Sequence, residues 1–222
     1  MNQCKVIAIT NQKGGVGKTT TTVNLGVGLA KQGKTVLLID SDPQASLSLS
    51  LGFSSSEKGR KGLSDILTDI MESGDPTQEI HPIAHREGVH VIPGSLALSG
   101  IEVQLVNELS REQILKTYID SIRDRYDYVL IDCMPSLGMM TLNALCAADS
   151  VLIPMQPEYL SAKGLEQLVW TIHKVKKRMN PTLRIDGVLF TMVDVRTVLA
   201  REMTTAIRQQ YGLRLHVMNT VI

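Results

Sequence analysis

The sequence has few cysteines, few aromatic residues and no long apolar run. Cys4, Cys133 and Cys146 are its three cysteines, too few and too irregularly spaced for a disulfide framework or a Cys-x-x-Cys zinc site, so we expect buried thiols. No apolar run reaches the roughly 18 residues of a membrane-spanning helix. The first residues also lack the charged and apolar segments of a secretory signal. We therefore expect a cytoplasmic protein.

The sequence also has no large excess of either charge, since the net charge is +1. The charged residues are, however, unevenly distributed along the chain. From Lys163 onward the chain has ten Lys or Arg and four Asp or Glu, whereas the first 162 residues have 13 and 18. Charge counts alone favour solvated helix faces in the last third. A surface that binds a polyanion is the alternative, because such binding needs local rather than net positive charge.

Short apolar runs alternate with longer helical patterns along the chain, which is typical of a parallel sheet with helices on both faces. We predict an α/β fold with a mostly parallel, twisted sheet in a single domain over residues 1–222. Strands are predicted at residues 5–10, 35–40, 89–92, 128–132, 151–154, 185–192 and 214–217. Helices are predicted at residues 18–32, 63–72, 101–109, 111–123, 142–148, 162–179 and 197–211.

Two further segments bear on how the chain is organised, a loop and the carboxyl end. Residues 52–62 are rich in serine, glycine and charge, which predicts a surface loop. The chain ends soon after its last predicted strand, so we expect a domain that is truncated at its carboxyl end.

The stretch Asn-Gln-Lys-Gly-Gly-Val-Gly-Lys-Thr-Thr, residues 11–20, predicts a phosphate cradle between a strand and a helix. Its glycines let successive N–H groups point at an anion, and the helix adds its positive end. Lys18 is expected to reach the β- and γ-phosphates of a nucleoside triphosphate, and Thr19 to place its hydroxyl on Mg²⁺. The phosphate oxygens would be held by the backbone of Gly14, Gly15, Val16, Gly17, Lys18, Thr19 and Thr20. The usual pattern G-x-x-x-x-G-K-[ST] has a glycine where this chain has Gln12, and Lys13 adds a second lysine.

Three aspartates follow two of the predicted strands. Asp132 ends the run Val-Leu-Ile-Asp and is the candidate carboxylate for Mg²⁺. Asp40 and Asp42, in Asp-Ser-Asp-Pro-Gln, fall at the same edge of a parallel sheet, where α/β proteins bind their ligands. We expect Asp40 to support the metal shell and Asp42 to orient an attacking water. The alternative is an ordinary turn built by Asp42 and Pro43.

These motifs resemble those of the deviant Walker ATPases, and most closely of the ParA/Soj partition proteins. The motifs are Lys-Gly-Gly-Val-Gly-Lys-Thr at 13–19, Asp-x-Asp-Pro-Gln at 40–44 and Ile-Asp-Cys-x-Pro-Ser-Leu-Gly at 131–138. The resemblance runs from about Lys5 to the end and includes Thr-Met-Val-Asp-Val-Arg at 191–196. One departure is Met134, which stands where the family commonly has the first of two prolines.

The resemblance implies a P-loop NTPase fold and an ATPase that uses ATP and Mg²⁺ and is weakly active alone. Lys13 would be the signature lysine that reaches the partner's phosphates in an ATP-sandwich homodimer. Lys18 and Asp42 would be the other catalytic residues, and Asp132 the Walker B carboxylate. ATP-bound dimers of the family bind double-stranded DNA without sequence preference, and hydrolysis stimulated by a ParB-type partner releases them. The implied role is segregation of a chromosome or plasmid on the nucleoid.

The late basic residues are candidates for that DNA contact. Arg196 matches a family position implicated in it, whereas the others are inferred from charge alone: Lys174, Lys177, Arg201 and Arg208. Plain surface charge is the alternative for each. No helix-turn-helix segment precedes Lys5, so we do not expect operator-specific repression.

Two other function classes share the cradle. A MinD-like membrane-cycling ATPase carries an amphipathic helix at its C-terminus, and the sequence has none before Ile222, so we expect no membrane partner. A metabolic ATPase of the nitrogenase-reductase or amidotransferase type is the other alternative. The cysteines do not have the pattern of a cluster site, and no substrate pocket can be located from the sequence.

Overall fold

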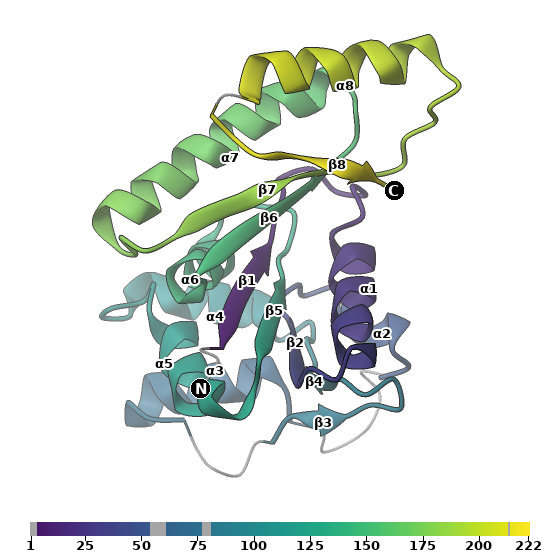
Figure 1. The fold of residues 1–222 in the computed structure, drawn as a ribbon. Coiled ribbons are helices and arrows are strands. Elements are labelled where there is room, and N and C mark those ends of the chain that lie inside the picture. The colour runs from purple at the N-terminus through teal and green to yellow at the C-terminus, as the bar shows by residue number, and fades with distance from the viewer. Residues whose placement is uncertain (1–3, 54–60, 77–80, 213) are drawn as a thin grey trace.

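The computed structural model describes residues 4–53, 61–76, 81–212 and 214–222. Most of the loop predicted at 52–62 lies outside these residues. The core is an eight-stranded sheet with the order β3-β4-β2-β5-β1-β6-β7-β8 (Figure 1). The strands are β1 (Lys5–Ile9), β2 (Val36–Asp40), β3 (Ile83–Ala84), β4 (His90–Ile92), β5 (Tyr128–Asp132), β6 (Ser150–Met155), β7 (Arg184–Phe190) and β8 (Val217–Val221).

The helices lie on both faces of this sheet. The α-helices are α1 (Lys18–Lys31), α2 (Ser46–Ser50), α3 (Leu63–Ser73), α4 (Leu98–Gln104), α5 (Ile114–Ile122), α6 (Met139–Ala147), α7 (Tyr159–Arg178) and α8 (Val198–Tyr211). Two short 3-10 helices, η1 (Leu105–Asn107) and η2 (Arg123–Arg125), extend α4 and α5. Among the described helices, none is both long and apolar enough to cross a membrane.

The sheet is parallel except at one margin. β1 pairs in parallel with β5 on one side and β6 on the other, and β2 pairs in parallel with β5. Only the two-residue strand β3 runs antiparallel, against β4, among the described strands. The carboxyl ends of β1, β2, β5 and β6 therefore meet at one edge, which is where open α/β sheets bind ligands.

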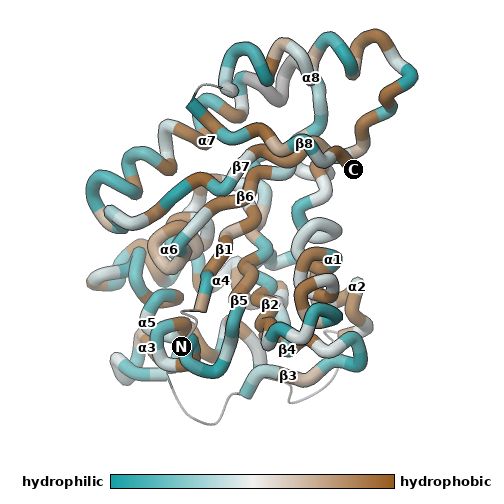
Figure 2. The backbone as a smooth tube through the Cα atoms, viewed as in Figure 1, coloured by the Kyte–Doolittle hydropathy of each residue, from teal (hydrophilic) through white to brown (hydrophobic). Residues whose placement is uncertain are grey.

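Alternation along the strands divides the core into two layers. In β1, Val6 and Ala8 belong to the cluster that packs against α3 to α8, whereas Ile7 and Ile9 belong to the cluster under α1 and α2. Both clusters are buried because each strand residue faces one helical layer. Figure 2 shows hydrophobic residues along the inner strands and more hydrophilic ones on the outer helices. Cys4, Cys133 and Cys146 are buried and carry free thiols, as expected.

The predicted elements are mostly confirmed, with shifts at a few places. The last strand covers Val217–Val221 rather than residues 214–217, because the later residues pair with the edge strand β7. Helix α2 was not predicted: its sequence Ser-Leu-Ser-Leu-Ser alternates like a strand. Strand β3 was missed because it has only two residues. That residues 1–222 form one domain stays a prediction.

Candidate nucleotide site

The loop between β1 and α1 forms an open cradle. Gly15 and Gly17 have φ angles of +71° and +81°, which glycine adopts without strain. A side chain at Gly14 or Gly15 would meet no atom within 4 Å, so the space before the loop is open. Helix α1 begins with Gly17 as N-cap, without a side-chain cap or an acidic residue in its first turn. Its first N–H groups are therefore oriented to bind an anion.

Lys18 points into the protein from the start of α1. It is 7% exposed, and its Nζ donates a hydrogen bond to the carbonyl oxygen of Lys13 at 3.0 Å. Burial lowers the pKa of this ammonium, and the negative charges of Asp132 and Asp42 oppose the shift. The bond to the Lys13 carbonyl is the one hydrogen bond of the Lys18 ammonium among the described residues. An ammonium has three donors, so two remain for a phosphate.

Lys13 points the other way, to the rim of the cradle. Its ammonium forms an ion pair with Glu158, which precedes α7, and lies 3.5 Å from Oε1 of Gln156. The side chain is 37% exposed. The two lysines of the loop thus diverge: one lies inside the cradle, and the other is held at its margin by residues that follow β6.

Asp132 and Thr19 are in direct contact. The hydroxyl of Thr19 donates to Oδ2 of Asp132 at 2.6 Å, and that of Thr22 lies 3.4 Å from Oδ1. Burial raises the pKa of the Asp132 carboxyl to about 7, and the charges of Asp40 and Asp42 add to the increase. The hydrogen bond from Thr19 and the charge of Lys18 oppose it. A hydroxyl beside a carboxylate that forms no ion pair with the described residues fits a hard cation such as Mg²⁺.

Asp40 is buried and engaged with α2 rather than with Thr19. Its Oδ2 accepts hydrogen bonds from the backbone N–H of Ser48 at 2.8 Å and from the Ser48 hydroxyl at 2.7 Å. Burial raises the pKa of the Asp40 carboxyl, and the hydrogen bonds from Ser48 oppose the increase. These contacts position the chain after β2. A role for Asp40 in the metal shell stays a prediction.

Asp42 forms the turn that was the alternative interpretation. Its Oδ1 accepts a hydrogen bond from the backbone N–H of Gln44 at 2.9 Å, and its carbonyl accepts one from Ala45 at 2.9 Å. Its charge still acts on Lys18 and Asp132 across the site. The turn and a role in orienting water are therefore compatible, and the latter stays a prediction.

Residues outside the phosphate loop and the three aspartates complete the cradle. The Thr191 hydroxyl, just after β7, donates to the carbonyl of Val16 at 2.8 Å. Gln156 Nε2 lies 3.4 Å from the carbonyl of Gly15. These two residues and Glu158 were missed by sequence reasoning. Their positions were the available signal: Gln156 and Glu158 follow the strand predicted at 151–154, and Thr191 falls at the end of the strand predicted at 185–192, both at the edge that carries the loop.

The candidate DNA residues lie on α7, on α8 and in the segment before α8. Arg196 forms two hydrogen bonds of 2.8 Å with the Asp194 carboxylate. Arg208 donates to the carbonyl of Met218 at 2.8 Å and so ties α8 to β8. Lys174 lies over the exposed ring of Trp170, with Nζ 3.4 Å from the ring centroid. Lys177 and Arg201 are exposed, and their side chains make no such contact with the described residues. Arg196 lies in the segment between β7 and α8, whereas Lys174 and Lys177 lie in the last turns of α7, the long helix beside β7 in Figure 1.

Comparison with known proteins shows the family to which the sequence is similar. A family model described as AAA domain (AAA_31) matches residues 4–185. The sporulation initiation inhibitor protein Soj of Bacillus subtilis is 44% identical over 207 residues, which are 93% of this chain and 80% of Soj. The chromosome partitioning protein ParA of Caulobacter vibrioides is 42% identical over 213 residues, 95% of this chain and 78% of ParA.

Solved structures show the same fold. Cobyrinic acid a,c-diamide synthase from Mycobacterium smegmatis, with bound ADP and magnesium, has a TM-score of 0.88 and 36% identity, covering 99% of this chain and 86% of that one. A plasmid partition protein from Borrelia burgdorferi has a TM-score of 0.76 and 27% identity, covering 93% and 86%.

The fold and the loop define a P-loop NTPase with a second lysine in its phosphate loop. Within that class, the chain belongs to the ParA/Soj family of partition ATPases.

Proposed function

We propose that this protein is an ATP-dependent partition ATPase that acts on DNA as a nucleotide-switched dimer. The observation that carries the proposal is the divergence of Lys13 and Lys18. Lys18 is buried in its own cradle, whereas the Lys13 ammonium is at the rim, paired with Glu158. A cation held outside its own cradle is suited to a phosphate bound by a second subunit. Cations supplied in trans raise phosphoryl-transfer rates by about 10³ to 10⁵ in related systems.

ATP and Mg²⁺ are the cofactors in this proposal. The residues present fit them, because Lys18 keeps donors for phosphate, and Thr19 offers an oxygen next to those of the buried Asp132. Bound Mg²⁺ supplies positive charge against the β- and γ-phosphate oxygens. The relatives solved with ADP or an ATP analogue and magnesium support this assignment.

The dimer is tested by Lys13→Gln. We expect this variant to bind ATP normally but to lose ATP-dependent dimerisation and turnover, measured by light scattering and phosphate release. Lys31→Gln, at the exposed end of α1, is the matched control and keeps both. A Lys13→Gln variant that dimerises and turns over like wild type overturns the role in trans.

Asp42 is proposed to orient the attacking water, so its loss separates hydrolysis from assembly. Asp42→Ala keeps ATP-dependent dimers and stops turnover in this proposal. Hydrolysis at the normal rate would remove Asp42 from the mechanism. Loss of dimers as well would show that its turn with Gln44 is what matters.

DNA binding is proposed for the ATP-bound dimer only, with a ParB-type partner that stimulates hydrolysis and releases the DNA. Binding should need ATP and weaken with salt, with a log–log slope of about 0.9 per phosphate neutralised. Arg201→Gln, on exposed α8, reduces affinity and slope, whereas Lys34→Gln, near the opposite edge of the sheet, changes neither. Binding that ignores ATP or salt contradicts the proposal. In this proposal the protein is cytoplasmic and associates with the nucleoid through its DNA binding.

A metabolic ATPase is the second candidate, favoured by the likeness to the Mycobacterium smegmatis synthase. The two functions separate in one experiment. Retention of ATP-loaded protein on double-stranded DNA supports partition. A small molecule from a metabolite screen that raises ATP turnover in the absence of DNA supports the synthase-like function.

A further inference from the structure

A second cavity lies at the opposite edge of the sheet, where β1, β6 and β7 begin. It has a volume of about 590 Å³, within the range of small-molecule sites. Strand β1 separates it from the phosphate loop by five residues, roughly 17 Å at 3.3 Å each. The cavity is therefore not part of the nucleotide site.

Basic groups outnumber acidic ones in the cavity wall. Two carboxylates line it, those of Asp149 and Asp186, against four cationic side chains: Lys5, Lys116, Arg123 and Arg184. A third carboxylate, that of Asp120, lies beside the wall and pairs with Lys116 and Arg123. The carboxylates of Asp127 and Glu112 also act on the wall residues Cys4 and Cys146, so positive charge is in excess among the side chains that line the wall and not beyond it.

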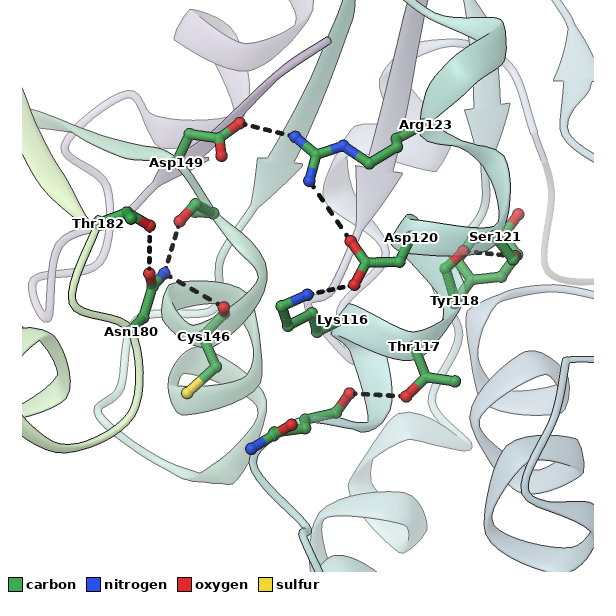
Figure 3. Close-up of polar contacts among 12 residues, drawn as sticks. Lys116, Thr117, Tyr118, Asp120, Ser121, Arg123, Cys146, Asp149, Asn180 and Thr182 are labelled. Carbon is green, nitrogen blue, oxygen red and sulfur yellow. Dashed lines mark hydrogen bonds and ion pairs between the residues drawn. The ribbon is translucent and has the colours of Figure 1, made fainter. Parts of the chain in front are cut away.

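The carboxylates are already neutralised by contacts within the chain. Asp149 accepts from Arg123 Nη2 at 3.3 Å and from the backbone N–H of Val6 at 2.8 Å. Asp186 accepts from Lys5 Nζ and from the Ser150 hydroxyl, both at 2.8 Å. Figure 3 shows the first part of this network, with Arg123 between Asp149 and Asp120 and Lys116 reaching the same Asp120. A cationic ligand would find no carboxylate without a partner here.

Arg184 is the exception in the wall. It is exposed, and its guanidinium has no hydrogen bond or ion pair with any residue that the structure describes. Its backbone is fixed, because its N–H donates to the carbonyl of Asp149 at 3.1 Å at the start of β7. A guanidinium presents five donors in a planar fork that matches carboxylate and phosphate oxygens.

We propose that this cavity binds a small organic oxyanion, a phosphate ester or a carboxylate, with Arg184 as the main ligand-binding group and Lys116 as the second. The Lys116 ammonium pairs with Asp120 at the rim, its one ion-pair partner in the described part of the chain, and the side chain is 42% exposed. The site is independent of the partition role and of the nucleotide.

The test is calorimetric titration of the protein saturated with a non-hydrolysable ATP analogue and Mg²⁺, so that the phosphate loop is filled. The probes are inorganic phosphate and succinate at matched ionic strength, which separate the two oxyanion chemistries. We expect one of them to bind saturably with a Kd of about 1 mM or below. Arg184→Gln weakens that binding about tenfold or more, since a charge-assisted hydrogen bond is lost.

Arg178→Gln, an exposed arginine at the end of α7 outside the cavity wall, is the matched control and binds the probe like wild type. Equal affinity of all proteins for the ATP analogue establishes that they are folded. The proposal is overturned if neither probe titrates, if Arg184→Gln binds as wild type does, or if Arg178→Gln weakens binding equally.

Discussion

Strand β5 has an aspartate at each end, and the two have opposite properties. Asp127, just before the strand, is on the surface, where hydrogen bonds from the N–H and hydroxyl of Thr35 lower the pKa of its carboxyl. Asp132, the last residue of the strand, is 1% exposed, and burial raises its pKa to about 7. The amino edge of the sheet therefore pairs its carboxylates within the chain, whereas the carboxyl edge holds a buried carboxyl group that a bound cation would neutralise.

The sharpest test of this contrast is Lys18→Ala. We expect about a hundredfold or greater loss of ATP affinity, because hydrogen bonds between an ammonium and phosphate are worth about 1.5–3 kcal/mol each. Fluorescent-nucleotide titration measures it. Lys5→Ala, which removes a lysine paired with Asp186 at the other edge, should leave ATP affinity unchanged. If the two variants bind ATP equally well, the assignment of the cradle is wrong.

A substitution at the amino edge of the sheet should instead lower the stability of the fold and leave ATP affinity unchanged. The Asn180 side chain donates to the carbonyls of Leu145, Cys146 and Ala148 at 3.0, 3.2 and 2.7 Å, so it closes the end of α6. We expect Asn180→Ala to lower the free energy of unfolding by about 2–3 kcal/mol, because buried carbonyls lose their donors. Urea denaturation measures the loss.

The control for Asn180 is its neighbour. Thr182→Val removes only the hydrogen bond from the Thr182 hydroxyl to Asn180 Oδ1, so about 1 kcal/mol is expected. ATP affinity of the folded protein stays the same in both variants. A specific loss of ATP binding in Asn180→Ala would mean that the two edges are coupled rather than separate.

The pKa of Asp132 predicts a pH dependence. Mg²⁺ needs the carboxylate, so Mg²⁺-dependent ATP affinity should fall about tenfold between pH 8 and pH 6, as protons compete below a pKa of about 7. The free energy of unfolding of the nucleotide-free protein should change in the opposite direction. Because the pKa of the Asp132 carboxyl is raised in the folded state, the stability that its protonated form contributes is lost as the pH rises toward 7.

Two variants isolate this group. Asp132→Asn should bind Mg²⁺-ATP weakly at every pH, without the slope. Asp127→Asn should keep the slope of wild type. A slope that survives in Asp132→Asn would place the titrating group elsewhere in the site.

The smallest expected effect concerns Glu158. Glu158→Gln removes the ion pair that holds Lys13, and an exposed pair is worth about 0.2–1 kcal/mol. ATP-dependent dimers should therefore form at about two- to fivefold lower protein concentration. Sedimentation measures this shift, with Glu202→Gln on α8 as control. Dimers that require more protein would mean that Glu158 helps to present Lys13 rather than restraining it.

The fold and the inner part of the site could be predicted because their signals are local. Glycines, a lysine and threonines within one stretch predict the cradle, and apolar runs that end in aspartate predict the strands that face it. The contact between Thr19 and Asp132 follows from the parallel pairing of β5, which ends at Asp132, with β1, which leads into the loop and α1.

What could not be predicted depends on partners that are remote in the sequence. Nothing near Lys13 indicates that Glu158 binds it, and nothing near Val16 indicates Thr191. Arg208 illustrates the same limit on the surface. Its charge was visible, but its use in holding β8 depends on how α8 packs.

The central position of β1 has a consequence for how the protein is made. This apolar strand is translated well before its neighbours β5 and β6, which begin at Tyr128 and Ser150, and the hydrogen bond from Thr191 to Val16 spans 175 residues. Contacts between distant residues form slowly, and unpaired apolar strands are prone to aggregate. Strand β1 is thus translated long before the strands that pair with it, and until then cover for its apolar side chains has to come from chaperones or from its own helix α1.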